Sequence, residues 1–413
     1  MRINKTIRLL EYLLAICIIL EFNTVYLIFP IIKRLIQILP VLILICLILL
    51  NRKGIPQTGR YITLYVIGCI FPLFSLNDNV YISYFLRYVL FIPLLWIYIS
   101  QRKEMGREAY LSMPLRFSDM TTIFAGISLV FWVICSVMNL VSPTMMIPYD
   151  WAPNIFSIPS FYNVYFETQR ANVFGEMISR NSGIFNEGPM HNMILCTAFT
   201  IEYFIRPQKS KRRITILILA ILSTLTTTGQ FFLIAIAIWH IYTKVGRKHR
   251  ILMLLILPII LMATYTTTNA IMESKKSTIN GESSISGRTE DIQYCIEIGM
   301  QNPIMGIGII PTENDVTWRG ERIGSSNSFF AVFARGGLYI LTLYVVALFI
   351  IPLLYYRKYK DTNWIMAMLC YLGLFTVTAC YLNLLTLFFI AWGLSNINLK
   401  CPSQLNYYPR TKY

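Results

Sequence analysis

The stretch LYILTLYVVALFIIPLLY, residues Leu338–Tyr355, contains no charged side chain and is apolar over almost its whole length. A helix that crosses the hydrocarbon core of a bilayer needs about 20 such residues. Leu9–Ile28 and Ile123–Val141 are further apolar blocks. The chain of 413 residues is 56% hydrophobic and 14% charged, with a mean hydropathy of +0.57, whereas a soluble domain is about a quarter charged. These values predict an all-α polytopic integral membrane protein.

The apolar blocks predict about twelve transmembrane helices, since each has roughly the length that a crossing requires. The blocks lack the alternation of apolar and polar residues that marks the strands of a membrane barrel. We interpret residues 1–413 as a single transmembrane domain with two long extracytoplasmic loops, 142–182 and 267–327. The predicted spans are 9–29, 35–50, 61–76, 80–99, 121–141, 184–205, 214–227, 229–242, 251–266, 336–356, 363–381 and 383–397.

The formal net charge of +16 comes mainly from short Lys and Arg clusters between the predicted spans. Such clusters mark the cytoplasmic side of a membrane, and no motif typical of nucleic-acid binding accompanies them. The pattern predicts a multi-pass membrane protein with both termini cytoplasmic. Spans 214–227 and 229–242 together lie between two basic clusters, so we expect a hairpin whose tip TTTGQ, residues 226–230, reaches outward.

The segment SRNSGIFNEGPMHN, residues 179–192, brings polar and charged groups to the entrance of the predicted span 184–205. Pro189 is typical of a first helical turn, so the helix should begin near Glu187. Glu187 and His191 then lie four residues apart on one face, and Arg180 precedes them. In the alternative interpretation, Arg180 lies at the lipid interface and Glu187 only complements the helix dipole.

The segment SISGRTEDIQYCIEIGMQNPIMGIGI, residues 284–309, predicts a short amphipathic helix in the second loop, capped by Ser286. Arg288 would lie in its first turn, where free backbone N–H groups and the helix dipole favour an anion. The alternative is a surface helix in which Arg288 has no role. A third segment, SSNSFFAVFARGGLYI at 325–340, joins a polar cluster to a span interrupted by Gly336 and Gly337, or is a plain junction between loop and helix.

In their order and spacing, these segments resemble the Wzy-type O-antigen polymerase and O-antigen ligase superfamily, and the resemblance implies a GT-C-like polymerase/ligase fold. It covers the region from Arg180 to Leu341. The matching elements are Arg180-x-x-Gly183-Ile184-Phe185, the tip Thr226-Thr227-Thr228-Gly229, Gly287-Arg288, Asn302-Pro303-x-x-Gly306-x-Gly308, and Ser326-Asn327 with Gly336-Gly337.

The resemblance implies a glycosyltransferase that polymerises undecaprenyl-diphosphate-linked oligosaccharide repeat units into O-antigen or capsular polysaccharide. It also implies that the protein lies in the bacterial inner (cytoplasmic) membrane and acts at its outer face. Membrane lipid and a chain-length regulator protein are the further partners that it implies. Ligases of the family use a His at the position of Ser326, which argues against a ligase and leaves the general base open among His191, Glu187, Glu290 and Asp291. An O-antigen ligase and a transporter of polysaccharide or lipid-linked oligosaccharide are the alternatives.

A diphosphate leaving group requires positive charge in the transition state, and Arg supplies a permanent charge with bidentate geometry. We predict Arg180, Arg288, Glu187 and His191 as the catalytic residues, with the two Arg side chains on the diphosphate. No paired carboxylates or DxD motif and no CxxC spacing mark a metal site, so metal-independent transfer without a cofactor is expected. The predicted substrate-binding residues are Ser326, Asn327, Arg319, Arg322 and Thr228.

Arg87 lies inside the predicted span 80–99. A charge within the membrane is usually paired or functional. Its predicted partner is Glu21 or a lipid phosphate.

Overall fold

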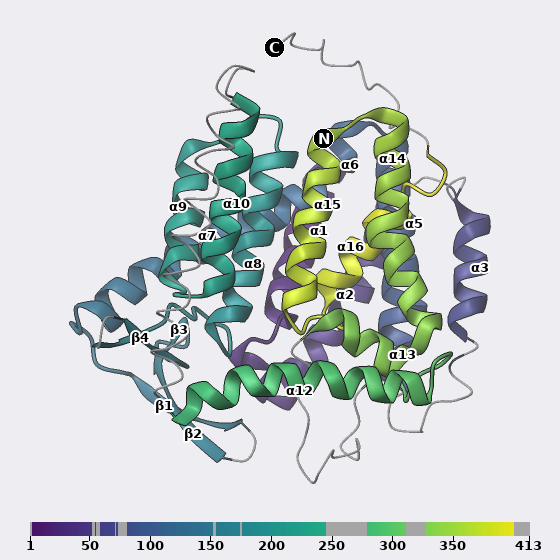
Figure 1. Ribbon diagram of the computed structural model, residues 1–413. Coiled ribbons are helices and arrows are strands. Elements are labelled where there is room, and N and C mark those ends of the chain that lie inside the picture. The colour runs from purple at the N-terminus through teal and green to yellow at the C-terminus, as the bar shows by residue number, and fades with distance from the viewer. Residues whose placement is uncertain are drawn as a thin grey trace. The chain divides into compact units, whose positions relative to one another are not determined.

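The computed structural model describes residues 2–51, 54, 58–70, 72, 81–151, 154–173, 176–244, 279–310 and 327–399. Most of these residues are helical (Figure 1). The chain divides into two compact units. The first unit comprises Met1–Thr121, Thr197–Ser210 and Asp291–Tyr413, and the second comprises Thr122–Cys196 and Lys211–Glu290.

The first unit is built from helices around α16 (Leu384–Leu394), whose residues are all buried. The sequence LLTLFFIAWGL is apolar on every side, which is typical of a helix enclosed by others. α16 packs against α1, α5 and the π-helix η7. The helices of this unit and its flanks are α1 (Arg2–Glu21), η1 (Val25–Ile28), α2 (Pro30–Asn51), α3 (Gly59–Ile70), α4 (Tyr81–Tyr84), η4 (Phe85–Phe91), α5 (Ile92–Glu104), α6 (Arg107–Tyr110), α7 (Ser112–Phe131), η6 (Ile201–Ile205), α13 (Ser328–Val345), η7 (Val346–Ile350), α14 (Ile351–Tyr359) and α15 (Thr362–Val377).

Four helical segments among the described residues are long and apolar enough to cross a membrane: Pro30–Asn51, Ile82–Glu104, Ser112–Val137 and Ser328–Tyr359. In α2, large apolar residues that remain exposed recur every three or four positions, as a lipid-facing stripe does. These residues are Ile31, Leu35, Ile38, Leu42, Ile45 and Leu49. The fold is therefore that of a helical integral membrane protein, as predicted. The predicted span 251–266 lies outside the described residues.

α13 is interrupted at Gly337, which has φ +57°. Backbone groups freed by such a break need partners at membrane depth, and the turn after α12 supplies them. Leu338 and Tyr339 donate to the carbonyls of Pro303 and Ile304 at 2.8 and 3.0 Å, while the carbonyls of Ala334 and Arg335 accept from Ile307 and Gly308 at 3.1 and 2.8 Å. The two predicted glycine motifs, at 302–308 and 336–337, thus bind each other through backbone atoms.

The second unit contains α9 (Lys211–Ser223), α10 (Thr227–Lys244), η5 (Trp132–Val137) and the greater part of α8 (Gly188–Thr200). Its first predicted loop forms two small antiparallel sheets, one of order β1-β2-β3 and one of β4-β5 (Figure 1). The strands are β1 (Met145–Trp151), β2 (Asn154–Phe161), β3 (Tyr165–Phe166), β4 (Arg170–Val173) and β5 (Glu176–Ser179). The prediction of an all-α protein is wrong for this segment, because backbone groups outside a helix still require hydrogen-bond partners and pair as strands.

α12 runs from Ile279 to Gln301, so the predicted short helix starting at Ser286 is wrong in its N-terminus. The helix ends next to Asn302 and Pro303, as predicted. Arg288 consequently lies in the helix interior, where backbone N–H groups are engaged by the preceding turn. Any contribution of Arg288 to anion binding must come from its guanidinium group.

The backbone contact between the glycine motifs at 302–308 and 336–337, here called the glycine junction, predicts different effects of two Gly-to-Ala substitutions on stability. A Cβ at Gly337 would lie 2.3 Å from the carbonyl oxygen of Ile304, whereas a Cβ at Gly373 in α15 would meet nothing within 4 Å. Gly337→Ala should lower the free energy of unfolding by roughly 1–3 kcal/mol, because φ is positive and the space is filled. Gly373→Ala should leave it unchanged or raise it. Unfolding in detergent measures both, and equal stability of the two variants would contradict the junction.

Candidate functional site

Arg180 follows directly on the hairpin formed by β4 and β5. Arg170 of β4 lies opposite Ser179 of β5 in the antiparallel register. One position further along, the N–H of Arg180 donates to the carbonyl of Gln169 at 2.9 Å. Residues directly opposite each other in an antiparallel pair project to the same face of the ladder. The hairpin therefore presents Gln169 and Arg180 as neighbours.

Glu187 lies immediately before α8, close to the predicted helix start. Its carbonyl accepts the N–H groups of Met190 and His191, each at 3.2 Å. The Gln169 side chain binds here twice: its amide nitrogen donates to the Glu187 carboxylate at 3.4 Å, and its amide oxygen accepts the N–H of Gly188 at 3.2 Å. The stem of Arg180 passes Gly188 so closely that a Cβ there would lie 3.3 Å from Arg180 Cδ.

The predicted hairpin tip between α9 and α10 packs against this segment. The Asn181 backbone N–H donates to the Ser223 carbonyl at 3.0 Å, and its side chain donates to Ser223 Oγ at 2.8 Å. A Cβ at Gly229 would lie 2.3 Å from Oδ1 of Asn192. The absence of a side chain at Gly229 thus lets the first turn of α10 approach α8.

His191 is 1% exposed and is enclosed by the predicted Gly-aromatic motif. Its Nδ1 lies 2.9 Å from the carbonyl oxygen of Asn181, and its ring stacks on Phe185 with centroids 5.0 Å apart. Gly183 has φ +56°, and a Cβ there would approach the His191 ring to 3.1 Å. These contacts give His191 a structural role in shaping the turn from Arg180 to Glu187.

Arg180, Glu187 and Arg288 form an electrostatic group. Burial raises the pKa of the Glu187 carboxyl, while the hydrogen bond from Gln169 and the charges of Arg288 and Arg180 act in the opposite direction. Burial lowers the pKa of the Arg180 guanidinium, and the Glu187 charge opposes that shift. An Arg remains charged at neutral pH in either case. Two cations thus act on one carboxylate, and the three groups together retain an excess of positive charge.

The remaining predicted site residues have different positions. Thr228 lies half-buried in the first turn of α10. Asn327 belongs to the first unit and caps α13, where its Oδ1 accepts the N–H groups of Phe329 and Phe330 at 2.9 and 3.3 Å. Ser326, Arg319 and Arg322 lie outside the described residues. Gln169 was missed by the sequence analysis, because only strand pairing brings it to Glu187.

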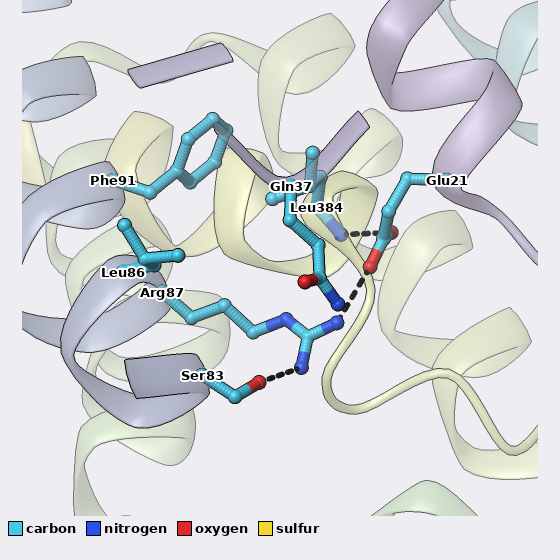
Figure 2. A pocket seen from close by; sticks show the side chains of 7 residues that line it. All are labelled: Glu21, Gln37, Ser83, Leu86, Arg87, Phe91 and Leu384. Atoms are coloured by element: carbon cyan, nitrogen blue, oxygen red, sulfur yellow. Dashed lines mark hydrogen bonds and ion pairs between the residues drawn. The ribbon is translucent and has the colours of Figure 1, made fainter. Parts of the chain in front are cut away.

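The predicted pairing of Arg87 with Glu21 is confirmed. Nη2 of Arg87 lies 3.0 Å from Oε1 of Glu21, and the two side chains are 17% and 7% exposed. Figure 2 shows that Arg87 also donates to Ser83, and that Glu21 accepts the N–H of Leu384 at the start of α16. Gln37, Leu86 and Phe91 complete this pocket. The pair joins η4, α1 and α16, so we assign it a structural role.

Comparisons with known proteins bear on the second half of the chain. Residues 214–345, from α9 into α13, match the family model described as O-antigen ligase. The resemblance to the O-antigen ligase and polymerase superfamily is thereby confirmed. No curated protein and no solved structure matches the chain. Residues 214–345 are thus similar to O-antigen ligases, and this similarity points to a function of the O-antigen ligase or polymerase type.

The structural role of His191 predicts that its hydrogen bond to Asn181 contributes to the stability of the fold, and that its basicity is not needed for glycan transfer. His191→Ala should lower the free energy of unfolding by about 1–3 kcal/mol, because it leaves the buried Asn181 carbonyl without a partner and opens a cavity. His191→Gln retains a donor and should keep most of the transfer activity. Unfolding and glycan-transfer assays on both variants measure this. An inactive but stably folded His191→Gln variant would contradict the assignment.

Proposed function

We propose that the protein polymerises undecaprenyl-diphosphate-linked oligosaccharide repeat units into O-antigen or capsular polysaccharide, at the outer face of the bacterial inner membrane. The observation that carries the proposal is that the charges of Arg180 and Arg288 both act on the Glu187 carboxyl, so that the three form one group with an excess of positive charge. About twelve spans, cytoplasmic termini and two outer loops belong to the same proposal. The transfer requires stabilisation of a diphosphate, and this group has the charge for it.

Arg180 is suited to the leaving group by more than its charge. Its Nε is buried and has no hydrogen-bond partner within the described part of the chain. A buried donor without a partner costs roughly 1–3 kcal/mol, and a phosphate oxygen would satisfy it. We assign Arg180 and Arg288 to the diphosphate. The two Arg side chains and Glu187 together carry one net positive charge, which the more highly charged diphosphate anion would neutralise.

The proposed step is a displacement at the anomeric carbon. The oxygen of the acceptor hydroxyl forms a bond to this carbon, the bond from the carbon to the diphosphate oxygen breaks, and its electron pair leaves with the diphosphate. Glu187 accepts the hydroxyl proton. It is only half-buried, whereas His191 is enclosed and already bound to Asn181. These differences favour Glu187 over His191 as the general base.

An O-antigen ligase is the second candidate, since the matching family model carries that description. Ser326 at the position of the family's His favours the polymerase. The residues Thr228, Asn327, Ser326, Arg319 and Arg322 remain proposed contacts to the glycan. The two functions differ in the acceptor hydroxyl and share the diphosphate leaving group.

Arg180→Ala and Arg288→Ala should each reduce chain elongation at least about 100-fold, because each removes a charge that stabilises the leaving group. The measurement is a gel of surface polysaccharide from a deletion strain complemented with each variant at equal membrane level. Arg170→Ala, at an exposed residue of β4, is the matched control and should restore long chains. Survival of activity in either site variant removes that residue from the site.

The deletion strain itself separates the candidate functions. Single-repeat product restored to long chains by the wild type supports the polymerase. Long chains that persist on the lipid carrier and never reach their final acceptor would identify a ligase instead. Single repeats that fail to reach the surface would identify a transporter.

A general base acts only when it is deprotonated, so the transfer rate should fall as the pH falls through the pKa of Glu187. Burial raises this pKa above the ordinary carboxyl value, so the decline should begin at a higher pH than for an exposed Glu. Rates of the purified protein measured between about pH 5 and pH 8 test this. Glu187→Gln should be slow and should lack this decline; an unchanged profile in that variant would exclude Glu187 as the base.

A further inference from the structure

Gln169 makes three hydrogen bonds, and each goes to a different part of the candidate site. Its carbonyl accepts the N–H of Arg180 at 2.9 Å. Its side-chain oxygen accepts the N–H of Gly188, and its side-chain nitrogen donates to the Glu187 carboxylate. A single residue thus connects the Arg180 backbone, the Glu187 carboxylate and the N-terminus of α8.

The backbone around Gln169 is held in place independently of these contacts. The N–H of Phe166 donates to the Gly183 carbonyl at 2.9 Å. Trp132 in η5 donates its Nε1–H to the carbonyl of Ser179. Ser179 directly precedes Arg180, whose N–H binds the Gln169 carbonyl. Gln169 is therefore presented by a fixed support, which a positioning residue requires.

The side-chain amide fits its two partners in one orientation only. The nitrogen must face the carboxylate, which only accepts, and the oxygen must face a backbone N–H, which only donates. A Glu at this position would place a second carboxylate against Glu187, and a Leu would satisfy neither group. The position therefore requires a neutral side chain with both a donor and an acceptor.

The charged groups that act on Glu187 are Arg288 from α12 and Arg180 from the turn before α8. Neither forms an ion pair with Glu187 within 4.0 Å in the part of the chain that the structure describes. The close partner of the carboxylate is instead the neutral amide of Gln169. The two guanidinium groups are consequently not closed off by a direct ion pair with Glu187.

We propose that Gln169 is a positioning residue, which binds the Glu187 carboxylate and the start of α8 so that Arg180 and Arg288 stay open to the diphosphate. The inference rests on the proposed function, since it assigns Gln169 to the same site. It adds a residue from the outer-loop hairpin that acts through Glu187 and touches no reacting atom.

The test is a double-mutant cycle on the purified full-length protein in detergent, with Gln169→Ala, Glu187→Gln and the double variant. Elongation of lipid-linked repeat units gives kcat and KM as a function of pH. Gln169→Ala should lower kcat roughly tenfold, the effect of losing one hydrogen bond to a charged group. The pH at which the rate declines should rise, because the hydrogen bond that opposes the raised Glu187 pKa is lost.

In the Glu187→Gln background, Gln169→Ala should have little further effect, because residues that act through one another are not additive. Met177→Ala, an exposed position on β5 of the same hairpin, is the matched control and should retain the wild-type rate and pH profile. Additive losses in the double variant would overturn the proposal. So would a loss of stability in Gln169→Ala without any movement of the pH profile.

Failure of the proposed function is distinguishable from failure of this inference. The affinity for undecaprenyl diphosphate is measured for the wild type and the same three variants. This binding does not depend on the acceptor. A wild type that binds this lipid and elongates nothing would contradict the polymerase, while a non-additive cycle in binding would still support Gln169. A wild type that elongates chains with an additive cycle would overturn the role of Gln169 alone. A wild type that binds no undecaprenyl diphosphate would overturn both.

Discussion

A membrane offers no hydrogen-bond partner to a buried polar group, so each such group must find one within the protein. This constraint accounts for the main polar contacts of the first unit. The Glu21 carboxylate binds Arg87 and also the free N–H of Leu384 at the start of α16. The break of α13 at Gly337 is tolerated because the turn after α12 satisfies the freed backbone groups.

The same requirement shapes the candidate site of the second unit, with a different result. Most polar groups there have protein partners: Asn181 binds Ser223, His191 binds the Asn181 carbonyl, and Gln169 binds Glu187. The buried Nε of Arg180 has none among the described residues. Oδ1 of Asn181, Oγ of Ser182 and Oδ1 of Asn186 are likewise buried without a partner among the described residues. Of these open atoms, the Arg180 donor is the cationic one, which an anion from outside the chain would satisfy.

Sequence patterns predicted helices best where lipid and burial act on long segments. The apolar run of α2 and the wholly apolar α16 are examples, because their composition leaves few other stable arrangements. The patterns were less reliable outside the spans, where backbone groups can bind water or pair with neighbouring strands as well as form a helix. Ser286 was predicted as a cap, yet α12 continues back to Ile279. The aromatic segment 142–182 was interpreted as a loop, and its strands depend on pairing that no residue periodicity made evident.

The sequence by itself determined that this is a helical membrane protein and that Arg180, Glu187 and Arg288 are candidates for one site, since hydropathy and charge are properties of the residues themselves. It also reduced the partners of Arg87 to Glu21 or a lipid phosphate, because few charged partners exist inside a membrane, and the structure decided for Glu21. Only the tertiary structure decided that His191 is enclosed by Gly183 and Phe185. It alone brought Gln169 to Glu187, because a cross-strand register and a helix start meet there through contacts between residues distant in sequence.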